Sequence, residues 1–200
     1  MDTTKKALAR GRPRRFDPEK GVAVAQQLFH ERGFDAVGVA DITAALGINP
    51  PSFYAAFGSK MGLYGRVLDR YTATGAIPLT DLLRPDRPVA ECLGAMLEEA
   101  ARRYAGNPEA TGCLVVEGVR SDDPDARAAA CRFQQDAEAV IRAYIAARYP
   151  DKAGELTDFV SATMSGMSAK ARTGLTLDRV MAIARLAGHA LAQALEDGPL

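Results

Sequence analysis

The chain has 200 residues, 25 basic and 25 acidic side chains, and 48% hydrophobic residues. This length predicts one or two domains, and the apolar fraction excludes wholesale disorder. No apolar run reaches the roughly 18 residues of a membrane span, and the basic N-terminus lacks the apolar segment of a secretory signal. Three scattered cysteines predict a reducing cytoplasm and no disulfide scaffold.

The neutral total hides an asymmetry in charge. Residues 1–72 carry 11 basic and 7 acidic side chains, and six of the basic ones lie within the first 16 residues. A basic tip predicts contact with a polyanion at one end of the molecule. The alternative is a solvated tail that serves only solubility. Because residues 1–14 lack apolar periodicity, we expect a flexible basic arm there.

Local signals predict a series of helices after the arm. Asp17-Pro18-Glu19 is typical of a helix start, because Asp caps, Pro suits the first turn and Glu favours the positive end of the dipole. Gly33 is a plausible stop. Short helices are expected over about 39–46 and 50–57, and a longer one from about residue 60.

The rest of the chain also shows helical spacing. A Pro-rich stretch over 75–88 is expected to be a connection. The predicted helices beyond it cover about 88–105, 112–120, 124–148, 152–172 and 177–195. Since neither β alternation nor an internal repeat occurs, the expected fold class is all-α, with about nine helices.

Residues 38–57 have the pattern of a helix-turn-helix. Gly47 lies at the turn, where a positive φ is cheap only for glycine. A small core is expected from Ile42, Leu46, Ile48, Phe53 and Phe57. Left outside are Asn49, Pro50, Ser52, Tyr54 and Ala55. An exposed helix with small and hydroxyl side chains fits a DNA major groove. An ordinary αα-hairpin is the alternative.

Residues 16–71 resemble the DNA-binding domain of the TetR family of bacterial transcriptional regulators. The resemblance rests on LFHERGF at 28–34, on DI at 41–42 with LGI at 46–48, on SFYAAF at 52–57, and on SK at 59–60 with Leu63. Its most specific part is the spacing of Tyr54, Phe57 and Lys60. It implies a DNA-binding domain over 15–75 and a C-terminal domain over 76–200 for effector binding and dimerisation.

The resemblance also implies roles for single residues. Tyr54 would contact the DNA backbone or a base, and Lys60 would meet a phosphate beside a helix N-terminus. Arg12, Arg14 and Arg15 stand where the family carries a basic arm that can enter the minor groove. The candidate DNA contacts are Arg12, Arg14, Arg15, Asn49, Pro50, Ser52, Tyr54 and Lys60. We expect Tyr54 and Lys60 to point outward.

This chain departs from the family pattern at three places. Gly38 replaces the frequent Ser or Thr at the start of the second helix, and Ala40 replaces a polar residue. Pro50-Pro51 removes two N–H donors and leaves open whether the recognition helix begins at Pro50 or Pro51, and whether Asn49 caps it. We therefore expect the arm and Lys60 to supply much of the DNA affinity.

The resemblance implies that the last two helices pair with those of a second protomer. Their small residues would permit close approach; these are Ala162, Ser165, Gly166, Ala169, Ala184, Ala187 and Gly188. The alternative is packing within the chain's own core. An effector pocket is expected between the middle helices, lined by Leu93, Met96, Leu97, Cys113, Leu114, Val115, Phe133 and Tyr144. An apolar ligand suits these residues, though most could equally be plain core.

Cys113 follows Gly112 at a helix start, in a segment similar to one common in the family. Two roles are open for Cys113: a thiol that senses oxidants or electrophiles, or a small buried hydrophobic residue. His30 and His189 have no metal-ligand spacing, and His30 is expected at the surface or the core edge. No catalytic motif or cofactor signature occurs, so we expect no enzyme, metal or cofactor.

The resulting prediction is a homodimeric repressor that a small molecule releases from a palindromic operator. It has two alternatives. One is a constitutive DNA-binding protein without an effector. The other is a small-molecule-binding helical protein, or an enzyme, whose basic arm is incidental.

Overall fold

The computed structural model describes residues 16–196, and within that range it contains helices and no β-strand. The predicted all-α fold class is confirmed. The elements are α1 (Pro18–Arg32), α2 (Val39–Leu46), α3 (Pro50–Phe57), α4 (Lys60–Thr74), α5 (Leu79–Leu82), α6 (Val89–Ala105), α7 (Leu114–Gly118), α8 (Pro124–Ala146), the 3-10 turn η1 (Pro150–Lys152), α9 (Ala153–Arg172) and α10 (Leu177–Glu196).

The first three helices begin and end at the residues that the local signals indicate. The Asp17 carboxylate accepts a hydrogen bond from Glu19 N at 3.1 Å and caps α1. Gly47 ends α2 in the left-handed region at φ +63°, where a side chain would be strained. α3 begins at Pro50, and Asn49 Oδ1 accepts from Ser52 N at 2.9 Å. The open question about the recognition helix is thus resolved: Asn49 is its cap.

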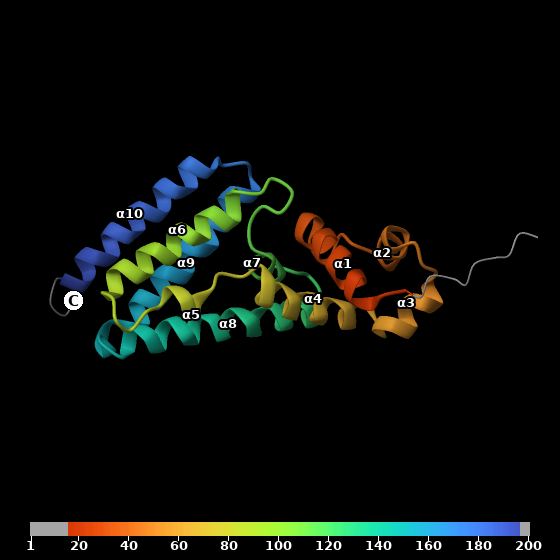
Figure 1. Ribbon diagram of the computed structural model, residues 1–200, viewed down its shortest axis with the longest axis horizontal. Helices are drawn as coiled ribbons and strands as arrows, with labels where there is room; N and C mark the ends of the chain where they lie inside the picture. The colour runs from red at the N-terminus through yellow and green to blue at the C-terminus, as the bar shows by residue number, and fades with distance from the viewer. Residues whose placement is uncertain (1–15, 197–200) are drawn as a thin grey trace, which may run out of the picture.

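The molecule is elongated (Figure 1). α1 to α4 form one end, and α6, α9 and α10 form the other. α8 runs along one side and contacts both α4 and α9. This arrangement places the two ends in contact through α4, α7 and α8, so a change at one end can reach the other.

α6 packs closely along α10 because both helices lack a side chain at the crossing. A Cβ on Gly188 would lie 3.5 Å from Gly94 Cα. Ala184 and Ala187 are buried in the same chain. These α10 residues therefore pack in the chain's own core. On α9, by contrast, Ala162 and Gly166 are exposed.

The connection between the two ends contains a turn of helix that its sequence does not predict. α5 is a single turn within the Pro-rich stretch, with Leu83 N bonded to Leu79 O at 2.8 Å. It packs against α6 and α8. The other predicted helices are all present. None of the helices within 16–196 is long and apolar enough to cross a membrane.

Candidate nucleic-acid interface and effector cavity

The outer face of α3 is the first candidate site. Phe53 is fully buried and Phe57 is 7% exposed, so these two rings fasten the helix to the core. Tyr54, one position along, is 52% exposed, which is unusual for a large aromatic residue. The exposed face that results comprises Asn49, Pro50, Pro51, Ser52, Tyr54 and Ala55. The spacing of the sequence predicts this division between core and surface.

This face has the size and chemistry for a DNA groove. It offers one aromatic hydroxyl, one serine hydroxyl and one amide, with small residues between them. A helix of this width enters a major groove with its N-terminal residues toward the base edges. Since Asn49 Oδ1 is used in capping, the Asn49 amide N–H group is what the side chain can offer to DNA.

At the start of α2, the carboxylate of Asp41 caps the helix, because Gly38 has no hydroxyl that could do so. Gly38 N donates to Asp41 Oδ2 at 2.8 Å, and Arg32 contacts the other oxygen at 3.2 Å. The Gly38 hydrogen bond, followed by the Arg32 guanidinium, holds the pKa of Asp41 below its usual value. The helix is therefore capped from its third residue, although Gly38 brings no side chain.

Lys60 does not point outward as expected. Its Nζ lies 3.9 Å from the centre of the Phe34 ring, a cation–π contact. Burial lowers the pKa of Lys60, and the nearby Asp35 and Asp123 offset part of this effect. The side chain is long, and an aromatic face and two carboxylates attract it inward. What α4 presents at its start is its backbone N–H groups, beside the Ser59 cap.

The arm cannot be placed on this interface. Arg12, Arg14 and Arg15 lie outside the described residues. Their contribution to DNA binding stays a prediction from the sequence.

Arg172, the last residue of α9, joins the two ends of the molecule. Its Nη1 donates to His30 O at 2.7 Å, and its Nη2 donates to Glu31 O at 3.1 Å. These carbonyls belong to the last turn of α1. The last carbonyls of a helix have no N–H donor within the helix, so Arg172 supplies one. The Nε of Arg172 lies 3.5 Å from Glu117 Oε2 on α7. One guanidinium thus ties α9, α7 and α1 together.

His30 is a second tie, and it is buried, contrary to the expectation of a surface or core-edge position. The side chain is 7% exposed. Its Nε2 lies 3.2 Å from Gly112 O, which can accept a hydrogen bond from it. The ring packs edge-on against Tyr71. Burial is the main cause that lowers the pKa of His30; the Gly112 hydrogen bond opposes it.

Asp35 is a third tie, from the loop between α1 and α2. Its Oδ1 accepts from Ser121 Oγ at 2.8 Å, and its Oδ2 accepts from Asp122 N at 3.0 Å. The acceptor thus belongs to the loop between α1 and α2, and the donors belong to the turn before α8. Together with Arg172 and His30, this contact fixes the orientation of α1 relative to the rest of the chain.

A cavity of about 470 Å³ is the second candidate site. It lies between the end of α4, the connection with α5, and helices α6 to α9. Its wall is mainly apolar. The lining residues from α8 and α9 are Phe133, Gln134, Asp136, Ala137, Glu138, Val140, Ile141, Ser161, Met164 and Ser165. Those from the remaining elements are Tyr71, Thr72, Ala76, Ile77, Pro78, Leu79, Thr80, Tyr104, Cys113, Val115 and Val116.

Three of the eight residues proposed for the pocket line this cavity, namely Cys113, Val115 and Phe133. Leu93, Met96, Leu97 and Leu114 are instead core residues with 0–2% exposure. Tyr144 is also outside the cavity wall, and its hydroxyl donates to Arg84 O at 2.9 Å. The α6 residues miss the cavity because α6 turns its apolar face to α9 and α10.

Cys113 lies where the cavity meets the DNA-binding end. It is 9% exposed, and the Tyr71 hydroxyl is 3.4 Å from its Sγ. Tyr71 in turn contacts the His30 ring. The contacts permit both interpretations of this thiol, sensor and buried hydrophobe. Among the residues that the structure describes, no group of three or more His, Cys, Asp or Glu could hold a metal ion.

A shallow apolar groove between α9 and α10 is the third feature. Two large apolar side chains stand out from it: Phe159 is 41% exposed and Leu186 is 70% exposed. The groove is lined by Phe159, Thr163, Gly166, Met167, Lys170, Ile183, Leu186, Ala187 and Ala190. Exposed leucine and phenylalanine on adjacent helices are typical of a protein interface.

Comparisons with known proteins agree with these features. Residues 22–67 match the family described as "Bacterial regulatory proteins, tetR family". The HTH-type transcriptional repressor BdcR of Escherichia coli (strain K12) is 54% identical over 197 residues, which cover 98% of this chain and all of the relative. The HTH-type transcriptional repressor ComR of the same strain is 28% identical, covering 88% of this chain and 89% of the relative.

A similar solved structure is a cysteine mutant of the TetR family transcriptional regulator CifR, complexed with 26-bp double-strand operator DNA. It has a TM-score of 0.81 and 28% identity, and the match covers 90% of this chain and 99% of that one.

Proposed function

Because the chain belongs to the TetR family of bacterial transcriptional regulators, we propose that it is a homodimeric repressor of a palindromic operator. A small molecule that enters the cavity would release the DNA. The observation that carries the proposal is the outer face of α3, where Tyr54 is 52% exposed between two buried phenylalanines. BdcR, a repressor by name, is similar to this chain over its whole length.

DNA binding would use the unit of residues 15–75. α3 would enter the major groove, with Ser52, Tyr54 and the Asn49 amide nearest the DNA. The N-terminus of α4 would face a phosphate through its backbone N–H groups. Lys60 would add its charge once its ammonium leaves the Phe34 ring. The basic arm would follow the adjacent minor groove, as proposed from the sequence.

The remaining unit, residues 76–200, would form the dimer and hold the effector. The groove between α9 and α10, with its exposed Phe159 and Leu186, is the surface that we assign to the second protomer. A two-fold dimer has a functional reason, since two α3 helices one DNA turn apart can read a palindrome. A bacterial regulator of operators works in the cytoplasm, and this is the location that we propose.

Release would operate through the ties between the two ends. The cavity wall includes Tyr71 and Cys113, and Tyr71 packs against His30. A ligand that moves α7 would displace Glu117, and with it Arg172 and the end of α1. To move most molecules into the orientation that cannot bind DNA, the ligand must bind that orientation more tightly than the DNA-binding one, by several kcal/mol.

The alternatives are less well supported. A constitutive DNA-binding protein would need no cavity, whereas this chain has one of about 470 Å³. A small-molecule-binding protein or an enzyme with an incidental arm does not agree with membership of a family of DNA-binding regulators.

Selection of bound sequences from a random duplex pool tests the proposal. The purified full-length protein should enrich an inverted repeat whose half-sites are about one helical turn apart. Enrichment of one unrepeated site would contradict the dimer. A pool that stays random, at a salt concentration low enough to favour phosphate contacts, would contradict specific DNA binding.

A further inference from the structure

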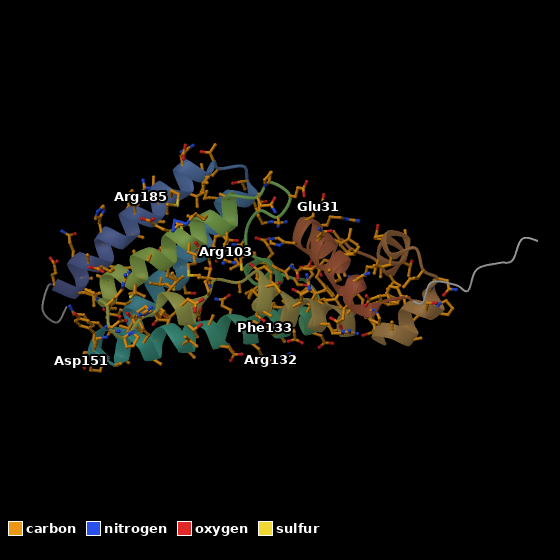
Figure 2. All side chains as sticks on the ribbon, viewed as in Figure 1. Glu31, Arg103, Arg132, Phe133, Asp151 and Arg185 are labelled. Atoms are coloured by element: carbon orange, nitrogen blue, oxygen red, sulfur yellow. The ribbon has the colours of Figure 1, made fainter. Side chains whose placement is uncertain are left out.

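The charges on the cavity wall are all of one sign. Asp136 and Glu138 are the only acidic side chains that the described residues contribute to the wall, and the lining contains no Lys, Arg or His. Arg103, whose charge acts on the nearby Tyr71, is not part of the wall and is paired with an acid: its Nε donates to Glu99 at 2.7 Å and its Nη1 to Gly75 O at 3.1 Å. Arg132 is exposed on the outer side of α8, next to the inward Phe133 (Figure 2).

Glu138 is held in place by its neighbours. Its Oε1 accepts from Gln134 Nε2 at 2.8 Å, one turn earlier on α8, and also from Ser161 Oγ on α9. Both hydrogen bonds use the same oxygen, so Oε2 takes part in neither. A carboxylate that is already oriented loses little freedom when a ligand binds to it.

The remaining lining residues suit a ligand that combines an apolar part with a positively charged group. Three aromatic rings line the cavity, those of Tyr71, Tyr104 and Phe133, together with aliphatic side chains such as Ile77 and Met164. Aromatic faces attract cations as well as apolar surface. The carboxylate of the half-buried Glu138, in a partly enclosed site of lower dielectric, attracts a cation and repels an anion more strongly than it would in water, and the exposed Asp136 adds less to this effect.

We propose that the ligand of this cavity is an apolar molecule with one positive charge, such as a protonated amine, and that Glu138 receives the charge. The proposal rests on the effector function proposed above and names its ligand class. Anionic compounds, including carboxylates and phosphates, are excluded from the site because no basic side chain of the described wall would neutralise them.

The test uses three probes with the same apolar chain: octylammonium, octanol and octanoate. Binding to the full-length protein is measured by isothermal titration calorimetry without DNA. We expect octylammonium to bind about ten-fold or more tighter than octanoate, with octanol between them. In Glu138→Gln, which keeps the shape of the side chain, this preference should fall about five-fold or more. Asp136→Asn should reduce it less, because Asp136 is exposed.

The matched control is Asp151→Asn, which removes the same charge from η1, at the far end of the molecule (Figure 2). It should leave the preference unchanged, and thermal melting checks that each variant is folded. Equal binding of the three probes, tighter binding of octanoate, or no binding of octylammonium would overturn the proposal. An equal fall in preference in Asp151→Asn would also overturn it, since the effect would then be one of net charge.

Operator release is measured separately, by fluorescence anisotropy of a labelled duplex. If octylammonium binds selectively but does not release DNA, the ligand class stands and the effector role in the proposed function fails. If the DNA is released by all three probes without regard to charge, the ligand class fails and the effector role stands.

Discussion

At the scale of single residues, Tyr54 makes the sharpest prediction. Because it is 52% exposed, replacing it should hardly change the stability of the fold. Tyr54→Ala is expected to weaken operator binding about ten-fold or more, because the variant would lack the DNA contact that we propose for this side chain. Tyr54→Phe separates the hydroxyl from the ring. Anisotropy titrations measure both variants, and wild-type affinity in Tyr54→Ala would remove Tyr54 from the interface.

His30 makes a prediction about pH. Its pKa in the fold is lowered, mainly by burial, so the unfolded chain binds the proton more readily. This group's contribution to stability is therefore complete above the unfolded value of about 6.5 and is lost as the pH falls below it. Between about pH 7.5 and 5.5, urea unfolding should show wild type losing more stability than His30→Gln, whose amide can still donate to Gly112 O. Parallel pH curves would contradict this.

The burial of His30 could not be predicted from its own neighbourhood in the sequence. Its partner, Gly112 O, is 82 residues away, and His30 sits near the end of a helix whose spacing looks amphipathic. Lys60 is a similar case. Its position at the start of α4 is predictable, but its direction depends on Phe34 and Asp35, which lie in the loop after α1, about 25 residues earlier in the chain. Local signals determine where such residues lie, and long-range packing determines where they point.

At the scale of elements, Arg172 is the residue that joins α9 to α1. Arg172→Ala leaves two carbonyls of the last turn of α1 and the Glu117 carboxylate without this partner, at a cost of about 2–3 kcal/mol in unfolding free energy. Arg172→Lys should recover part of it, since it restores the charge without the planar fork.

Arg185 on α10 provides the control for this prediction. It is an exposed arginine, 3.7 Å from Glu98, so Arg185→Ala should change stability by less than about 0.5 kcal/mol. Urea unfolding measures all three variants. Equal effects of Arg172→Ala and Arg185→Ala would contradict the role that we assign to Arg172.

Most element boundaries could be predicted because strong local signals mark them. Asp17-Pro18, Gly47 and Ser59 all lie at helix ends in the structure. α5 could not be predicted, since one turn among prolines has no periodicity to detect. The cavity wall was predicted only in part. Which face of α6 looks into the cavity depends on how α10 packs against it, through Gly94 and Gly188, and this is a property of two distant segments.

At the scale of the whole molecule, the proposed dimer predicts the effect of replacing Leu186. This side chain is 70% exposed in the groove between α9 and α10. Leu186→Arg would place a positive charge on an apolar interface. Because the dimer is two-fold, the partner's copy of the same residue would bring a like charge close to it. We expect a shift of at least about ten-fold toward monomer, measured by sedimentation velocity, with operator affinity falling in parallel. A dimer unchanged in this variant would place the interface elsewhere.

The arm predicts how the complex responds to salt. Replacing Arg12 and Arg15 together by Ala should flatten the dependence of log affinity on log salt by about 0.9 unit for each phosphate that the arm of a protomer no longer neutralises. Titrations at several salt concentrations give this slope directly. An unchanged slope would mean that the arm does not touch DNA.

The central claim is that the outer face of α3 lies against operator DNA. It is tested most directly by placing the photo-crosslinking residue p-benzoylphenylalanine at position 54 and irradiating the complex with its selected operator. We expect crosslinks at two symmetrical positions, about one helical turn apart. The same substitution for Asp151 should give none. A position-54 protein that binds the operator fully but forms no crosslink to it would contradict the account.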